Sequence, residues 1–302
     1  MTIGNFDGVH RGHQAVVRGV VARARELGVP AVVTTFDPHP MTVIHPDSAP
    51  LQLTSVQRRL DLLAELGVDA ALVLPFTREL SLWEPREFVE RVLVDALHAR
   101  EVHVGENFRY GHRAAGNLST LHREGGNHGF AVHAVPLSGD TATWSSTYVR
   151  QCLAEGDTTA AAAALGRPHR VEGPVVEGDK RGRELGYPTA NLALADDVAI
   201  PADGVYAGWL IRADRTRMPA AISIGTNPTF GGTVRRVEAY VLDRDDLELY
   251  GEHVGVEFAD RLRETITFEG VEPLLTQMAT DVQRAREITA YRALRRDTTP
   301  QP

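Results

Sequence analysis

Residues 2–17 read TIGNFDGVHRGHQAVV, and this stretch decides the fold of the first half of the chain. A short apolar strand end runs into a glycine-rich turn, and a helix follows the turn. Over residues 14–27 the apolar side chains fall on one helical face, which predicts an amphipathic helix. Strand, glycine turn and helix in this order are typical of a parallel sheet covered by helices. The stretch therefore predicts the first strand and first helix of an α/β domain.

Alternating strand and helix signals continue as far as residue 135. Further strands are predicted by short β-branched or apolar runs at residues 31–36, 70–76, 101–105 and 130–135. Helices are predicted by apolar periodicity at residues 56–66 and 85–97. Strands separated by helices imply a doubly wound parallel sheet with helices on both faces. Because such sheets bind ligands beyond the carboxyl ends of their strands, we expect a site at that edge.

The pattern changes after Arg150. Helical signals run to residue 168, and short β-rich segments then dominate, at residues 171–178, 204–212, 219–225, 235–243 and 253–258. Glycine, proline, asparagine and aspartate separate these segments at short spacings, which indicates a compact antiparallel β-barrel. Residues 271–296 add a long amphipathic terminal helix. We therefore expect an α/β domain at residues 1–152, a helical linker at 153–168 and a barrel domain at 169–302.

The composition narrows the class of protein. The 302 residues carry 32 Lys and Arg against 40 Asp and Glu, a formal net charge of −8. This acidic balance argues against a nucleic-acid partner, because polyanion binders present basic surfaces. The single cysteine, Cys152, excludes an internal disulfide framework. The sequence shows no apolar run long enough for a membrane span and no signal peptide, so we expect a cytoplasmic protein with no membrane partner.

The glycine-rich turn ends in two histidines, His10 and His13, three residues apart. On the first turn of a helix such a pair can face one point. The free N–H groups and the positive dipole end of a helix N-terminus suit a phosphate group. Imidazole N–H groups there can stabilise charge that develops on a phosphoryl group. A surface turn with incidental histidines and a metal-binding pair are the alternatives, although no third metal ligand stands nearby.

Three later segments of the first half carry polar groups suited to a ligand. TFDPHP at residues 35–40 follows one predicted strand, and GENFRYGHRAAGN at 105–117 follows another. SSTYVRQCL at 145–153 indicates a helix start whose hydroxyl and N–H groups can hold phosphates. Taken one at a time, the segments are also explained as a proline-ended loop, a glycine-bounded loop and a helix cap.

Together with these segments, the string GNFDGVHRGH resembles the adenylyltransferase module of prokaryotic bifunctional FAD synthetases, within the nucleotidyltransferase superfamily. The resemblance implies that His10 and His13 are catalytic and contact the ATP phosphates. It also implies a set of residues that bind ATP or flavin: Gly4, Phe6, Asp7, Gly8, Asp37, Pro38, His39, Gly105, Asn107, Phe108, Ser146, Thr147 and Arg150. Two features depart from the family pattern, Thr143 in place of an arginine and a short leader before the first strand. Because of Thr143, we expect that one phosphate contact is missing or supplied from elsewhere. Because of the short leader, we expect the first strand to be cut short.

A second glycine-rich string, RVEGPVVEGDKRGRELGYPTANL, spans residues 170–192. Its glycines permit a tight loop, and its basic side chains and backbone N–H groups can cradle phosphates. Thr189 and Asn191, two residues apart, offer oxygen ligands suited to Mg²⁺ bound jointly with a phosphate substrate. A basic glycine hairpin without a ligand is the alternative.

This string resembles the G-R-x-L-G-[FY]-P-T-A-N motif of riboflavin kinases. The resemblance implies Mg²⁺ or another divalent metal at Thr189 and Asn191, with Glu238 of a predicted strand as the catalytic base. It also implies that ATP or flavin is bound by Gly182, Arg183, Gly186, Pro188 and Arg263. The alternative for Glu238 is an exposed strand residue paired with a neighbouring arginine.

The two resemblances cover essentially the whole chain and imply a bifunctional enzyme. It would phosphorylate riboflavin to FMN and then join FMN to the AMP part of ATP, giving FAD and pyrophosphate. Mg²⁺ acts with ATP, and the implied partners are riboflavin, FMN, FAD, ATP, ADP and pyrophosphate, with a homo-oligomer left open. Two alternatives stay open as well: a riboflavin kinase whose first half has lost adenylyl transfer, and a flavin-binding module without turnover.

Overall fold

The computed structural model describes residues 1–136, 144–178, 182, 185–226 and 235–298. The chain divides into two compact units, an N-terminal unit at Met1–Ser146 and a C-terminal unit at Thr147–Pro302. Each unit has its own hydrophobic core, as expected for a chain of this length.

The N-terminal unit is built on a five-stranded sheet in which every neighbouring pair of strands is parallel. The strand order is β3-β2-β1-β4-β5. The strands are β1 (Thr2–Ile3), β2 (Val32–Asp37), β3 (Ala70–Pro75), β4 (Glu101–Gly105) and β5 (Ala131–Val135). The predicted doubly wound parallel sheet is confirmed.

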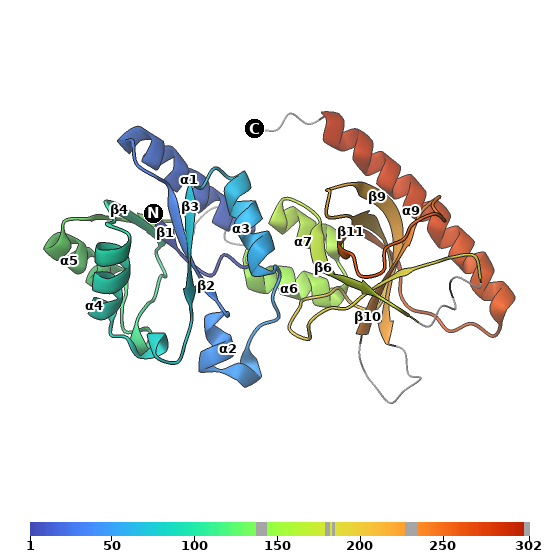
Figure 1. Cartoon of the computed structure of the whole chain (residues 1–302), viewed down its shortest axis with the longest axis horizontal. Coiled ribbons are helices and arrows are strands. Elements are labelled where there is room, and N and C mark those ends of the chain that lie inside the picture. Colours follow the sequence, from blue (N-terminus) through green and yellow to red (C-terminus); the bar gives the residue numbers. More distant parts are fainter. Residues whose placement is uncertain (137–143, 179–181, 183–184, 227–234, 299–302) are drawn as a thin grey trace. The chain divides into compact units, whose positions relative to one another are not determined.

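Helices cover both faces of this sheet (Figure 1). On one face α1 (Arg11–Leu27) and α3 (Val56–Glu65) pack over Val33 of β2. The other face carries α4 (Pro85–Phe88), η3 (Val89–Ala96) and α5 (Leu118–His128). The single helix predicted at residues 85–97 is therefore two segments, because the turns after Phe88 widen into a π-helix. Short elements complete the unit: α2 (Pro40–Ile44), η1 (Pro46–Ser48), η2 (Leu80–Leu82) and η4 (His112–Ala114).

The strand order reverses between β1 and β4. From β1 the chain moves outward through β2 and β3, and it then returns to the other side of β1 for β4 and β5. At such a reversal the loops run in opposite directions, and this leaves a crevice beyond the carboxyl ends of the two strands. Thr2 pairs with His103, so the segments that begin at Gly4 and Gly105 leave the sheet side by side.

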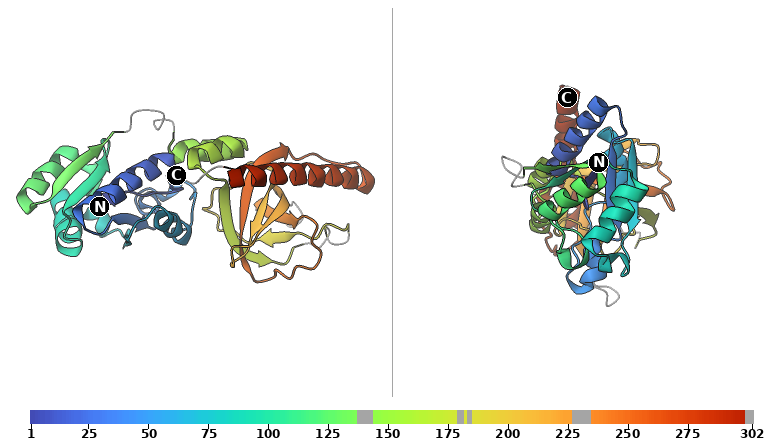
Figure 2. Two further views of the ribbon diagram at one scale, coloured as in Figure 1. Left: turned by 90° about the horizontal axis from the view of Figure 1, so that it is seen from above. Right: turned by 90° about the vertical axis from the view of Figure 1, so that its left-hand side faces the viewer.

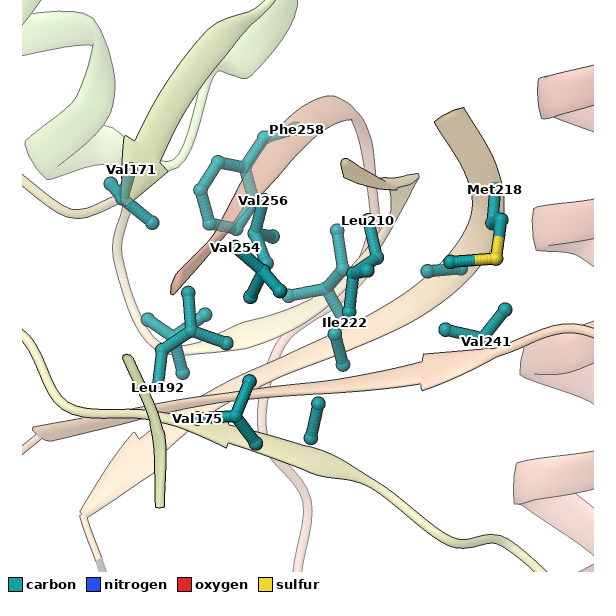
Figure 3. Packing of buried hydrophobic residues seen from close by; sticks show 14 of the residues in the cluster. Val171, Val175, Leu192, Leu210, Met218, Ile222, Val241, Val254, Val256 and Phe258 are labelled. Carbon is teal, nitrogen blue, oxygen red and sulfur yellow. The ribbon is translucent and has the colours of Figure 1, made fainter. Parts of the chain in front are cut away.

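The C-terminal unit is a closed barrel in which neighbouring strands are antiparallel, in the order β10-β7-β6-β11-β8-β9. Its strands are β6 (His169–Val176), β7 (Ala190–Leu192), β8 (Gly204–Ile211), β9 (Arg217–Thr226), β10 (Arg235–Val241) and β11 (His253–Arg263). Alternate side chains point inward and fill the barrel, with Leu210, Ile222 and Phe258 fully buried (Figure 3). The predicted barrel is confirmed, and the short strand β7 is an addition to the prediction.

Three helices accompany the barrel. α6 (Ser146–Glu155) and α7 (Thr158–Leu165) precede it, and Thr158 Oγ1 donates to the carbonyl of Ala259 at 3.0 Å. α9 (Val271–Thr298) lies along the outer wall in both views and buries Ala285 against Ala207 and Leu262 (Figures 1 and 2). No helix in the part of the chain that the structure describes has the length and apolar character to cross a membrane.

Candidate active sites

The glycine-rich turn after β1 has a backbone that side-chain-bearing residues rarely adopt. Phe6 has a φ of 48°, Gly8 of 79° and Val9 of 39°. A positive φ is strained for a β-branched residue such as Val9, and strain of this kind persists only where the surroundings enforce it. Strained backbone gathers at functional sites, so the turn is a candidate site on conformation alone.

The carboxylate of Asp7 helps to hold the turn in this strained conformation. It is 1% exposed and accepts the backbone N–H of Leu53 at 3.0 Å and of Thr54 at 3.1 Å. The hydroxyl of Thr54 in turn accepts the N–H of Gly8 at 3.2 Å. The predicted role of Asp7 as a ligand contact stays a prediction, while its observed contacts brace the turn.

Replacing Asp7 with alanine should destabilise the N-terminal unit. The two N–H groups of residues 53 and 54 would lose a charged acceptor in a buried place, a loss of about 2–3 kcal/mol of unfolding free energy. Urea unfolding of the full chain measures it. An unchanged midpoint in Asp7→Ala would contradict the bracing role, and the exposed Asp47→Ala serves as the matched control.

The two histidines meet at the start of α1. His10 is the N-cap, and its Nδ1 accepts the backbone N–H of His13 at 3.4 Å. The two imidazole rings stack with centroids 3.6 Å apart, and the ring of Phe6 meets His13 edge-on at 5.1 Å. Because Nδ1 of His10 accepts, a neutral ring carries its proton on Nε2, where it can donate to a ligand. The structure thus brings the predicted histidine pair to one point.

A buried arginine that the sequence analysis missed stands beside this pair. Arg59 of α3 is 1% exposed, and its Nη1 donates to Thr35 Oγ1 at 3.1 Å and to the carbonyl of Phe36 at 3.0 Å. Its charge acts on His13, and it is attracted by Asp7 and Asp37. The sequence did contain one signal that Arg59 is buried. Its spacing from Leu62 and Leu63 places it on the apolar face of the helix.

Burial sets the protonation of His13. It lowers the pKa of the imidazole well below the ordinary value, and the neighbouring His10 and Arg59 lower it further. The ring is therefore neutral at pH 7.

This neutral histidine predicts a pH dependence of stability. Below pH 6.5 the unfolded chain protonates residue 13 and the folded chain does not, so the folded state loses stability as the pH falls. Between pH 7.5 and 5.5 the unfolding free energy of the wild type should therefore fall by more than that of His13→Asn, which has no imidazole to protonate in the unfolded chain. Urea titrations at the two pH values measure the difference. The exposed His122→Asn should behave as wild type, and equal losses in all three chains would contradict the prediction.

The neighbouring strand ends bring further predicted residues toward the turn. His39 caps α2, and its Nε2 lies 3.1 Å from Nδ2 of Asn5, just after β1. Asp37 and Pro38 stand exposed at the end of β2. Gly105 ends β4, and the predicted residues Asn107 and Phe108 follow it, the first exposed and the second stacked on Tyr110 with ring centroids 5.5 Å apart.

The start of α6 also reaches the turn. Ser146 Oγ donates to the carbonyl of Asp7 at 2.9 Å, across 139 positions of sequence. Ser146 is the first helical residue of α6. Thr147 and Arg150 lie in the first two turns of α6, and their predicted roles stay predictions. Thr143, where the family has an arginine, lies outside the described residues.

In the barrel, the predicted metal and base residues form one cluster. Glu238 of β10 is paired with Asn191 of β7 across the strands, and its Oε2 accepts the hydroxyl of Thr189 at 3.4 Å. Asn191 Nδ2 lies 3.5 Å from Thr189 Oγ1. Asn191 Oδ1 is buried and has no hydrogen-bond partner among the described residues. A buried carbonyl oxygen without a donor suits a hard cation, so the cluster fits a divalent metal.

Thr189 and Asn191 of this cluster line a cavity in the barrel unit. The predicted residues Gly182, Pro188, Thr189 and Asn191 line it. Gly178 lies against the carboxamide of Asn191: a Cβ at position 178 would stand 2.5 Å from Asn191 Nδ2, so any other residue there would displace that side chain.

Of the other predicted residues in the C-terminal unit, Gly186 and Arg263 are not among the residues that line the cavity. Gly186 adopts a φ of 85° in the turn before Pro188. Arg183 lies outside the described residues. Arg263 ends β11, and its Nη2 lies 2.8 Å from the buried carboxylate of Asp281 in α9. The predicted role of Arg263 in binding ATP or flavin stays a prediction, while the observed ion pair connects α9 to the barrel.

Comparison with known proteins divides the chain in the same two parts. The family model for FAD synthetase matches residues 1–148, and the model for riboflavin kinase matches residues 165–289. The bifunctional riboflavin kinase/FMN adenylyltransferase of Escherichia coli strain K12 is 36% identical over 288 residues, covering 95% of this chain and 91% of the relative. The protein of the same name from Pseudomonas fluorescens is 39% identical over 296 residues, covering 97% and 94%.

A solved structure shares the whole architecture. A crystal structure described as a macrolide-efflux protein from Streptococcus pneumoniae superposes with a TM-score of 0.83 at 33% identity, covering 94% of this chain and 93% of that one. Two family models in sequence and relatives aligned over nearly the full length lead to one conclusion: this chain belongs to the bifunctional riboflavin kinase/FMN adenylyltransferase family.

Proposed function

We propose that the chain makes FAD from riboflavin in two ATP-dependent steps, each carried out by its own part of the chain. Residues 169–302 transfer the γ-phosphoryl group of ATP to the 5′-hydroxyl of riboflavin, and residues 1–152 join the resulting FMN to AMP, with 153–168 as the linker. The observation that carries the proposal is that each unit holds a separate cluster suited to phosphates. These are the stacked histidines at the start of α1 and the Thr189–Asn191–Glu238 cluster of the barrel.

In the adenylyl transfer step, a phosphate oxygen of FMN attacks the α-phosphorus of ATP. A new P–O bond forms, the bond to the β-phosphate oxygen breaks, and pyrophosphate leaves with the electron pair. His10 and His13 donate N–H groups to the charge on the transferring group, helped by the free N–H groups of α1. Asn107, Ser146, Thr147 and Arg150 hold the nucleotide. No covalent enzyme intermediate is needed, because positioning and charge stabilisation suffice.

In the kinase step, the carboxylate of Glu238 accepts the proton of the riboflavin 5′-hydroxyl as that oxygen attacks the γ-phosphorus, and ADP leaves. Thr189 and Asn191 would hold Mg²⁺ with the ATP phosphates, since Asn191 Oδ1 is a buried oxygen without a hydrogen-bond donor in the described chain. When bound, Mg²⁺ would neutralise part of the negative charge of the ATP phosphates. The contact between Thr189 and Glu238 holds the base beside these ligands.

Replacing Asn191 with leucine tests the metal role. Leucine keeps the volume but removes the oxygen, so the Mg²⁺ concentration for half-maximal kinase activity should rise about tenfold or more. FMN formation measured over a range of Mg²⁺ concentrations reports this. FAD formation from supplied FMN is the internal control and should not change. A kinase with unaltered Mg²⁺ dependence would contradict the metal role of Asn191.

One assay separates this function from its rivals. The purified chain is incubated with riboflavin, ATP and Mg²⁺, and the flavins are separated. FAD is expected as the end product, with FMN as the intermediate. FMN alone would favour a riboflavin kinase with an inactive N-terminal unit, and bound but unconverted riboflavin would favour a binding module. We expect the reaction in the cytoplasm, because ATP is a substrate of both steps.

A further inference from the structure

A second group of metal-ligating side chains lies on the sheet of the N-terminal unit, and the flavin chemistry does not use it. Glu101 and His103 of β4 are two residues apart, so both side chains project from the same face of the strand. His133 of β5 is the direct neighbour of His103 in the parallel register. Glu101 is the first residue of β4, whereas the crevice of the predicted nucleotide site lies beyond the last.

The three side chains converge on one point. The Nε2 atoms of His103 and His133 each lie 3.4 Å from Oε2 of Glu101. One ligand atom from each residue lies within 4.8 Å of the others. In a tetrahedral site with metal–ligand bonds of about 2.0–2.1 Å, neighbouring ligand atoms are about 3.3–3.4 Å apart. Both measured separations match an edge of that tetrahedron.

We propose that Glu101, His103 and His133 bind a divalent transition metal such as Zn²⁺. Two imidazoles and one carboxylate are a ligand set that zinc takes, with the fourth position left to water or a small ligand. His133 is 45% exposed and opens the site to solvent, whereas Glu101 and His103 are 13% and 14% exposed. The site therefore exchanges its metal without local unfolding.

Arg23 of α1 orients the carboxylate. Its Nη2 donates to Oε1 of Glu101 at 2.9 Å and its Nε to Oε2 at 3.0 Å. A carboxylate has about four lone-pair positions, so Oε2 can accept Arg23 and still bind a metal. Such outer contacts fix the orientation of metal ligands. Met1 adds a constraint from the other side, because its ammonium donates to the carbonyl of Glu101 at 2.7 Å.

A pair of protonated histidines does not account for the geometry. The two rings stack with centroids 4.6 Å apart, and two imidazolium charges at this distance repel each other. A divalent metal between the two rings and the carboxylate of Glu101 would remove this repulsion, because imidazoles bind metals in their neutral form.

The test is a titration of the metal-free full chain with Zn²⁺ alone, followed by calorimetry, and with Co²⁺, followed by its visible absorption. We expect one tight site with the intense bands of a tetrahedral cobalt centre. His103→Ala and His133→Ala should each weaken that site by at least about 100-fold, since even outer-shell changes cost 10–100-fold. Zn²⁺ should raise the Tm of the wild type and not that of His133→Ala, a half-exposed position whose replacement leaves the fold intact.

His128→Gln is the matched control. Nε2 of His128 lies 3.9 Å from Glu124 and 4.0 Å from Glu90, a histidine between carboxylates without a second histidine. This variant and His13→Ala should keep the cobalt bands. The proposal is overturned if the bands persist in His133→Ala, if they vanish in His13→Ala instead, or if the wild type has no tight site.

Discussion

Replacing His13 with alanine should abolish FAD formation and leave FMN formation intact. The ring of His13 is stacked on His10 at the N-terminus of α1, and burial keeps it neutral. Its loss removes a donor to the transferring group, while the backbone N–H of residue 13 can still donate to His10 Nδ1. Loss of one preorganised donor to a charge-developing oxygen costs about 10²–10³ in rate. We expect a fall of this size in FAD formation from supplied FMN and ATP, measured by separating the flavins.

Two comparisons make the result specific to the site. The kinase activity of the same variant should match that of the wild type, because the barrel is untouched. His122→Ala removes an exposed histidine of α5 in the same unit and should keep both activities. If His13→Ala retained adenylyl transfer within a few-fold of the wild type, the histidine pair would not be catalytic.

Replacing Glu238 with glutamine should have the opposite effect. Glutamine keeps the shape of the side chain and can still contact the hydroxyl of Thr189, but it cannot accept the substrate proton. Removal of a general base lowers the rate about 10²–10⁴-fold. We expect a loss in this range when FMN formation from riboflavin is measured.

The control for Glu238 lies in the same unit. Glu248→Gln changes an exposed glutamate after β10 and should leave both activities unchanged. Glu238→Gln should still convert supplied FMN to FAD at the wild-type rate, since the N-terminal unit is untouched. A Glu238→Gln chain that makes FMN normally would remove the base from the mechanism, and loss of both activities in a folded chain would refute the division between units.

Local patterns were sufficient for most of the architecture. Each strand of the parallel sheet but the two-residue β1 is a β-branched or apolar run, and four such runs mark β2, β3, β4 and β5 within a residue of their observed bounds. The barrel strands are also marked by such runs, with less accurate bounds: the run at residues 253–258 covers only the first part of β11. The exception is β7, whose three residues lie inside the glycine-rich motif. Short elements escape prediction because two or three residues carry too little periodicity.

The site residues were less evenly predictable. His10, His13, Thr189 and Asn191 stand in motifs short enough to be seen as strings, and the fold keeps each pair together. Arg59 was missed because an arginine in an amphipathic helix is ordinarily solvated, and only the packed structure shows it 1% exposed. The Glu101–His103–His133 cluster was missed because its third member comes from another strand.

The sequence by itself determined the succession of strands and helices along the chain, the two-part organisation and the family. These follow from the spacing of apolar, glycine and motif residues along a single stretch of chain, which local physical chemistry controls. Tertiary structure alone decided which distant residues meet. The hydroxyl of Ser146 reaches the carbonyl of Asp7 across 139 positions, and Glu238 faces Asn191 only because β10 pairs with β7. Such contacts depend on strand order and closure of the barrel, and these depend on the packing of the whole chain.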